Sequence, residues 1–220
     1  MIDDTTTTQR VTVSRRTVMR AAAWSVPVIA VAAAVPLASA SIEMVCPETP
    51  PGSEWETALE FGTLSAAGYT GWLNDALFVS DKDATLYATG TIFRTQTTFE
   101  AVAGTTYDFT LESGGVWASA GGRPTAQQDY IHGGQNVTIS MGGVQALQLS
   151  TRPDASGLPG TQIPMSNNQV IFNPFAFSYA ATATGPVTIV FRYILAGVSQ
   201  TAGHQGNDRI DIQNLTITCV

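Results

Sequence analysis

The chain has 220 residues, a hydrophobic fraction of 44% and a formal net charge of −7 at pH 7. Nucleic acids and anionic membrane surfaces are bound by clustered Lys and Arg, so this acidic, charge-poor composition argues against both as partners. The apolar fraction is also too high for a disordered chain. The residues that follow the N-terminal segment, which is described next, are enough for one folded domain of ordinary size.

The first element in chain order is an export signal. Residues 14–20 read SRRTVMR, an apolar run follows from Ala21 to Leu37, and Ala38-Ser39-Ala40 ends it. This pattern resembles the twin-arginine (Tat) signal of exported bacterial proteins, with Arg15 and Arg16 as the arginine pair. The resemblance implies recognition by the Tat translocase, export of an already folded chain and cleavage by signal peptidase after Ala40, with Ala38 and Ala40 as the small residues of the cleavage site. We therefore expect a secreted or cell-surface protein.

A retained membrane anchor is the alternative interpretation of the same segment. A spanning helix needs about 20 consecutive apolar residues. The run here is shorter and contains Pro27 and Pro36, which disturb a helix interior. We expect no stable membrane span after cleavage. We divide the chain into the signal 1–40, an extended leader 41–52 that contains Cys46, and a single domain 53–220.

The chain has two cysteines, Cys46 and Cys219. Outside the cytoplasm a disulfide persists, and only one pairing is available to this chain. A disulfide needs the two Cα atoms within roughly 7 Å of each other. We therefore predict a Cys46–Cys219 bond, and with it that the first and last strands are neighbours.

Alternating apolar and polar residues predict strands in the rest of the chain. Trp55, Thr57, Leu59 and Phe61 share one parity, and residues Glu54, Glu56 and Glu60 point the other way. Residues 69–79 are a weaker candidate because Asn74-Asp75 interrupts the pattern. Further strands are predicted at 84–93, at 97–102, at Tyr107 to Leu111, and in a hairpin of 137–141 with 144–150 around Gly142-Gly143.

The apolar parity switches inside two later segments, at Asn173-Pro174 and at Gln213-Asn214, and we expect a β-bulge at each position. Residues 187–195 are apolar on both faces and predict a central strand. No helical period occurs after Ala40. Repeated short strands without βα alternation indicate an all-β fold, a two-sheet antiparallel β-sandwich of jelly-roll type, preceded by a helical signal segment.

Two segments resemble galactose-binding-like jelly-roll modules of secreted proteins. Residues 99–109, FEAVAGTTYDF, are similar to the strand pair of those modules, which is joined by a turn and ends in Gly-x-x-Tyr-x-Phe. Residues 207–217, NDRIDIQNLTI, are similar to their closing strand. The resemblance covers about a tenth of the chain and implies the same sandwich. This chain has Gln213 where the family often has Asp, which places an inherited calcium site in doubt.

The candidate ligand-binding residues lie in the long irregular stretch 113–134. Stretches of this length in a compact domain are usually functional or disordered, and 151–168 is a second one. Exposed aromatic rings stack on the apolar face of a sugar, while Arg and Asp bond its hydroxyls. We therefore propose a glycan site in the first stretch; packing of Trp117 in the core is the alternative. Its residues are Trp117, Arg123, Asp129, Tyr130 and His132.

Asp208 and Asp211 are candidate oxygen ligands for a structural Ca²⁺, and Asp81 and Asp83 form a second such pair. Solvated turn carboxylates are the alternative for both pairs. We expect no other cofactor. The sequence contains no G-x-S-x-G elbow and no H-E-x-x-H motif.

We expect from these observations a non-catalytic secreted or cell-surface β-sandwich that binds a glycan or another surface protein. Two alternatives remain open. Thr- and Val-rich strands with few charges are typical of a structural or assembly subunit of the cell envelope. An exported hydrolase on a jelly-roll scaffold would need a pair of acidic residues, whose spacing in space the sequence does not reveal.

Overall fold

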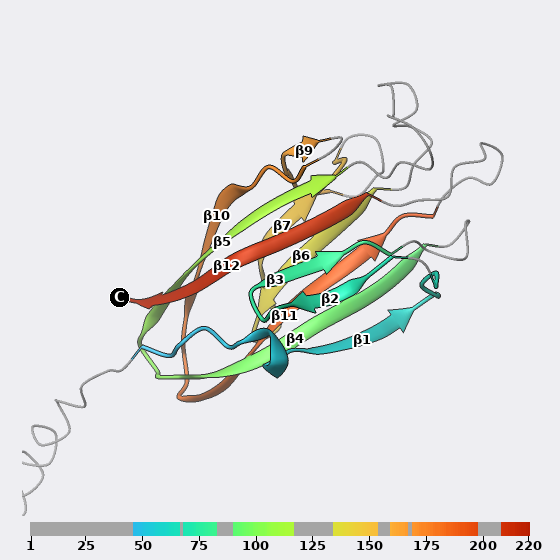
Figure 1. The fold of residues 1–220 in the computed structure, drawn as a ribbon. Coiled ribbons are helices and arrows are strands. Elements are labelled where there is room, and N and C mark those ends of the chain that lie inside the picture. Colours follow the sequence, from blue (N-terminus) through green and yellow to red (C-terminus); the bar gives the residue numbers. More distant parts are fainter. Residues whose placement is uncertain are drawn as a thin grey trace, which may run out of the picture. The chain divides into compact units, whose positions relative to one another are not determined.

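The computed structural model describes residues 46–66, 68–82, 90–116, 134–153, 159–166, 169–197 and 208–220, all within the unit Cys46–Val220 (Figure 1). The signal segment and its predicted helix lie outside the described residues. Within the described ranges, no helix is both long enough and apolar enough to span a membrane.

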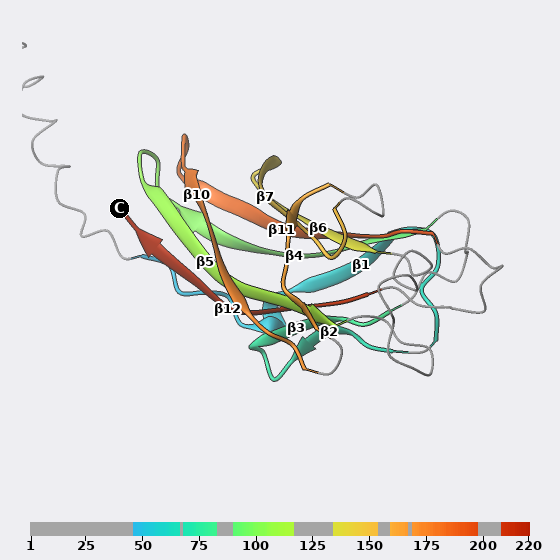
Figure 2. The same cartoon turned by 90° about the horizontal axis from the view of Figure 1, so that it is seen from above.

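Two β-sheets face each other (Figure 2), as the alternation predicted. The first sheet has the strand order β1-β4-β11-β6-β7-β8. It comprises β1 (Glu56–Phe61), β4 (Thr91–Ala101), β11 (Gly185–Leu195), β6 (Gln135–Met141), β7 (Val144–Ser150) and β8 (Thr161–Gln162). The second sheet has the order β10-β5-β12-β3-β2, with β9 beside β5. It comprises β10 (Asn173–Ala180), β5 (Thr106–Val116), β12 (Arg209–Cys219), β3 (Leu77–Ser80), β2 (Thr70–Leu73) and β9 (Met165–Ser166).

The predicted two-sheet β-sandwich is therefore confirmed. Consecutive long strands change sheet, from β3 to β4, β5 and β6 and again from β10 to β11 and β12, which is the connectivity of a jelly roll. The pairing is antiparallel except for two short parallel contacts, β5 with β9 and β7 with β8.

The inner faces of the two sheets form one hydrophobic core. In β5 the period-2 pattern places Tyr107, Phe109 and Leu111 inside, each at most 1% exposed. In β11, which pairs with β4 and with β6, Tyr193 stacks between two rings, at 4.9 Å from Phe78 and 4.8 Å from Phe93. The central position predicted for this strand is thus confirmed.

The segment 69–79 is two strands rather than one. Asn74 and Asp75 have φ values of 50° and 60° and form the turn of a β2–β3 hairpin. The turn comprises residues 74–76, in which the Ala76 N–H donates to the Leu73 carbonyl at 3.3 Å, and Asn and Asp tolerate a positive φ at its first two positions. The two residues that interrupt the alternation therefore belong to the turn.

The two predicted bulges have different outcomes. In β12 the register shifts between Gln213 and Thr216, and Asn214 has a φ of 53°, so this bulge is confirmed. The bulge at Asn173-Pro174 is wrong, because β10 begins at Asn173 and pairs with β5 without a shift. The parity changes there because the residues before Asn173 do not belong to the sheet.

Edge strand β1 is less buried than its parity predicted. Leu59 and Phe61 are 51% and 52% exposed, although both share the parity of buried Trp55. The strand lies at the edge of the first sheet and pairs only with β4. The register with β4 also shifts between Leu59 and Phe61, so the alternation is interrupted there, and the edge strand exposes two large apolar side chains.

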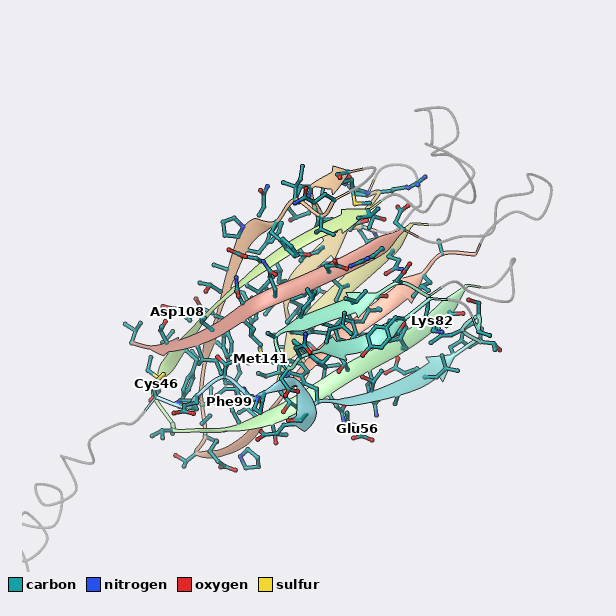
Figure 3. The ribbon with its side chains drawn as sticks, in the orientation of Figure 1. Cys46, Glu56, Lys82, Phe99, Asp108 and Met141 are labelled. Carbon is teal, nitrogen blue, oxygen red and sulfur yellow. A yellow bond between two sulfur atoms is a disulfide. The ribbon has the colours of Figure 1, made fainter. Side chains whose placement is uncertain are left out.

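The predicted disulfide joins Cys46 to Cys219, with the Cα atoms 5.6 Å apart (Figure 3). The expectation that the first strand lies beside the last is wrong, because β1 belongs to the other sheet. The leader around Cys46, which forms no strand, reaches β12 instead.

The two ends of the sandwich differ. At one end, here named the turn end, residues 102–105, 142–143 and 181–184 form short connections, and the disulfide lies there too. Main-chain hydrogen bonds tie two of these turns together, from Gly104 N to Ala181 O at 2.8 Å and from Ala181 N to Thr105 O at 2.9 Å. The opposite end is named the loop end. The strands that finish there are β1, β3, β5, β7 and β11, and the strands that begin there include β4, β6 and β12. The connections 62–69, 81–90, 117–134, 151–172 and 196–208 all start from this end.

Candidate functional site

The predicted ligand-binding residues Trp117, Arg123, Asp129, Tyr130 and His132 lie outside the described residues, as do Arg15, Arg16, Ala38 and Ala40 of the export signal. Both residues that flank the ligand-binding stretch are described. Val116 ends β5 and Gly134 precedes β6, and both are at the loop end. The chain therefore enters and leaves this stretch at the loop end.

Beneath the loop end, buried polar side chains connect the two sheets. Ser80 at the end of β3 donates its hydroxyl to Gln135 Oε1 at 2.9 Å, and Gln135 Nε2 donates to the Ser80 carbonyl at 3.1 Å. The backbone N–H of Gln135 donates to Thr151 Oγ1 at 2.9 Å. Buried polar groups with satisfied hydrogen bonds fix one arrangement of the chain. We name this set, with Arg152 and Asp208, the cross-sheet polar layer.

The most buried charges of this layer are those of Arg152 and Asp208. Arg152 Nε donates to Asp208 Oδ2 at 2.7 Å and Nη2 donates to Oδ1 at 2.8 Å, and the two side chains are 4% and 0% exposed. Arg152 follows β7 in the first sheet and Asp208 precedes β12 in the second. A bidentate Arg–carboxylate pair has a fixed geometry, so it fixes the distance between these two strand ends.

The two aspartates predicted as calcium ligands each contact an arginine. Asp208 accepts both bonds from Arg152, and Asp211 accepts bonds from Arg209 Nε at 2.7 Å and Nη2 at 2.6 Å. Among the described residues, no three acidic, His or Cys side chains come together as a metal site would require. A Ca²⁺ ion at either carboxylate would have to displace a guanidinium group. Asp83, of the second predicted pair, lies outside the described residues.

Asp81 begins the connection between β3 and β4, close to the Arg209–Asp211 pair. Partial burial raises the pKa of the Asp81 carboxyl, and the charge of Asp211 raises it further, while Arg209 and Lys82 oppose the shift. The pKa of Arg209 is raised, chiefly by its hydrogen bonds to Asp211. The Arg209 guanidinium thus binds Asp211 and also lowers the energy of the charged Asp81 carboxylate at this corner of the loop end, where Figure 3 labels Lys82.

A groove of about 410 Å³ lies away from the loop end, beside Trp72 of β2. It runs between the leader, the β2–β3 turn and the bulge of β12. Strand β3 pairs with β12 only as far as Gln213, so this side of β12 has no strand partner in the described structure beyond that point. The described residues that line the groove are Thr49, Pro50, Pro51, Trp72, Asp75, Ala76, Asn214, Leu215 and Thr216.

The neighbours of Trp72 hold it in place. Its ring lies 5.0 Å from that of Trp55 and 5.5 Å from that of Phe78, and its carbonyl accepts the hydroxyl of Tyr69 at 2.8 Å. Gly52 of the short 3₁₀ turn η1 (Gly52–Glu54) packs against it, because a Cβ there would come within 2.7 Å of Trp72 Cβ. The Trp72 indole N–H has no acceptor in the described part of the chain.

Neither a protein-family model nor a curated protein matches the sequence. Some solved structures share features of the fold. The carbohydrate-binding module TmCBM61, solved with β-1,4-galactotriose, is 10% identical, with a TM-score of 0.36 over 76% of this chain and 90% of that chain. A CBM4 structure is 11% identical, with a TM-score of 0.37 over 76% and 86%. CBM35 from Paenibacillus barcinonensis is 13% identical, with a TM-score of 0.29 over 80% and 98%. These values are too low to support a conclusion about this chain.

Sequence reasoning missed two sets of residues. Arg152 is a single arginine in an irregular stretch, and its partner Asp208 is 56 positions away, so no local pattern connects them. Trp72 and Asp75 lie in the segment whose alternation is interrupted. The turn signal at Asn74-Asp75 could have identified the hairpin and, with it, the exposed position of Asp75.

Proposed function

We propose that the chain is an exported, non-catalytic β-sandwich protein whose loop end binds a glycan. The observation that carries the proposal is the convergence of the long connections, including 117–134, on one end of the sandwich, while short turns close the other. Loops positioned by a rigid scaffold are where binding residues concentrate. The disulfide supports an oxidising compartment outside the cytoplasm.

The cross-sheet polar layer supplies the rigidity that such a site needs. Gln135, Arg152 and Asp208 are buried, and each lies next to one of the long connections. The hydrogen bonds of this buried layer hold the ends of these connections at fixed positions, which lowers the entropy cost of binding. Trp117 and Tyr130 are the proposed ring-stacking residues of the glycan site, with Arg123, Asp129 and His132 as its hydrogen-bonding groups.

The test is binding of the full-length protein to a glycan array and to cell-wall polysaccharide. Trp117→Ala and Tyr130→Ala should each abolish the signal without changing the melting temperature. Val144→Ala is the matched control, because Val144 is 69% exposed at the β6–β7 turn of the opposite end. Wild-type protein that binds none of the glycans would overturn the proposal, and binding to a surface protein alone would replace the glycan with that partner.

One observation favours an assembly role as a second candidate. Edge strand β1 exposes Leu59 and Phe61, and exposed apolar edge strands are templates for association. Light scattering at increasing protein concentration tests this role. Self-association that Phe61→Ser suppresses would support it, and a monomer at every concentration would remove it.

A further inference from the structure

The groove beside Trp72 offers hydrogen-bond acceptors and one negative charge. Asp75 is exposed, and its carboxylate makes no hydrogen bond or ion pair with the described residues. The side-chain N–H₂ of Asn214 donates one bond to Glu112 Oε2 at 2.9 Å, and its amide oxygen makes no hydrogen bond with the described residues. The Thr216 hydroxyl is shared with Thr110 at 2.6 Å. A ligand that brings a donor can therefore bind at the Asp75 carboxylate, which is the exposed charged group of the lining.

The charges around the groove all have one sign. None of the described lining residues is Lys, Arg or His, and Asp75 carries the only formal charge among them. Glu48 precedes the lining residue Thr49 in the chain, and Glu112 contacts Asn214. An anionic ligand would be repelled by this surface, whereas a cation would gain from every one of these carboxylates.

The walls of the groove are apolar and include an indole ring. Pro50, Pro51 and Leu215 face the groove together with Trp72. Indole is the best of the side-chain rings for attracting a cation, and apolar walls accommodate the methylene stem of a long basic side chain. The indole ring and the carboxylate at the rim suit the cationic head of an arginine or lysine side chain, and the apolar walls suit its methylene stem.

We propose that this groove binds the basic side chain of a partner protein, with the cationic head at Asp75 and the stem against Trp72 and Pro51. The occupant is an arginine or lysine in an exposed peptide segment of that partner. This site is separate from the proposed glycan site, because none of the groove's lining residues belongs to the stretch 117–134.

The test is a titration of the isotope-labelled full-length protein, followed by nuclear magnetic resonance at the Trp72 indole and the Asp75 amide. The probe is N-acetyl-Gly-Arg-Gly-amide, and its neutral counterpart carries citrulline in place of arginine. Asp75→Asn removes the charge and preserves the turn, because Asn accepts the φ of 60° found at Asp75. Glu100→Gln is the control variant, since Glu100 is exposed on the outer face of the other sheet.

The arginine peptide should shift both resonances, and added salt should weaken its binding. In Asp75→Asn the affinity should fall roughly tenfold, the difference between a charged and a neutral hydrogen bond, while Glu100→Gln binds as the wild type does. Absence of any shift would overturn the proposal. So would equal binding of the citrulline peptide or of a methyl glycoside, or an unchanged affinity in Asp75→Asn.

Discussion

Replacing Asp208 with Asn should lower the free energy of unfolding by about 3–5 kcal/mol, because it breaks a buried ion pair on one side only. The Arg152 side chain is 4% exposed and makes two short bonds to this carboxylate. In Asp208→Asn the Arg152 guanidinium stays buried, but the carboxylate that accepted both of its bonds is no longer charged. A folded domain is stable by about 5–15 kcal/mol, so this change removes a large part of the total.

The size of this loss of stability depends on the Arg152 charge remaining buried without its counter-charge. A second variant tests this point. Arg152→Met combined with Asp208→Leu removes both charges and fills the space with apolar atoms, so it should cost less than Asp208→Asn alone. Urea unfolding at pH 7 measures both changes through the transition midpoint, at a constant dependence on denaturant. Glu100→Gln is the surface control, expected within about 0.5 kcal/mol of wild type.

Two results would refute this reasoning. Asp208→Asn within about 1 kcal/mol of wild type would mean that the pair is worth no more than an exposed one. A double variant whose cost equals the summed costs of Arg152→Met and Asp208→Leu, each measured alone, would mean that the charges do not depend on each other.

Three further predictions concern the disulfide, one exposed carboxylate and calcium. Cys46→Ser with Cys219→Ser should lower the free energy of unfolding by up to about 5 kcal/mol, since the bond closes a loop with a sequence separation of 173, and urea unfolding would show the loss. Glu60 accepts bonds from Arg192 at 2.6 Å and from Arg94 at 3.2 Å, and these bonds, chiefly the one from Arg192, lower its pKa. Glu60→Gln should therefore cost roughly 0.5–1 kcal/mol at pH 7, and melting curves should show that this difference disappears as the pH falls through the lowered pKa of Glu60. Because arginines already occupy Asp208 and Asp211, neither calcium nor EDTA should change the melting temperature, and a calcium-dependent rise would restore the metal site.

Where one face of a strand is buried and the other is exposed to solvent, the alternation in the sequence predicted the strand correctly. Tyr107, Phe109 and Leu111 are inside for this reason, and the β6–β7 hairpin forms where Gly142-Gly143 predicted its turn. The same rule fails where a strand lies at an edge. Local parity cannot tell which strand has a neighbour on one side only, and the sheet order shows that β1 is such a strand.

The candidate sites were less predictable because distant segments build them. The groove beside Trp72 needs the leader, the β2–β3 turn and the β12 bulge, and nothing in the sequence of any one of them indicates that it meets the other two. The cross-sheet polar layer likewise joins Ser80 to Gln135 and Arg152 to Asp208 across the sandwich. Residues so far apart in the chain become neighbours only through the strand order.

The bond between Cys46 and Cys219 turns the described body into a covalent ring. A protease that cuts one of the connections at the loop end would leave a single molecule, seen as one band without reductant and as two fragments with it. The cut pieces would stay at a high effective concentration and could refold together, so damage at the exposed end would not disperse the protein. The chain segments outside this ring attach at Cys46 and Cys219, whose Cα atoms are 5.6 Å apart at the turn end, away from the proposed glycan site. A second protein fused at either attachment point would therefore leave the proposed glycan site accessible.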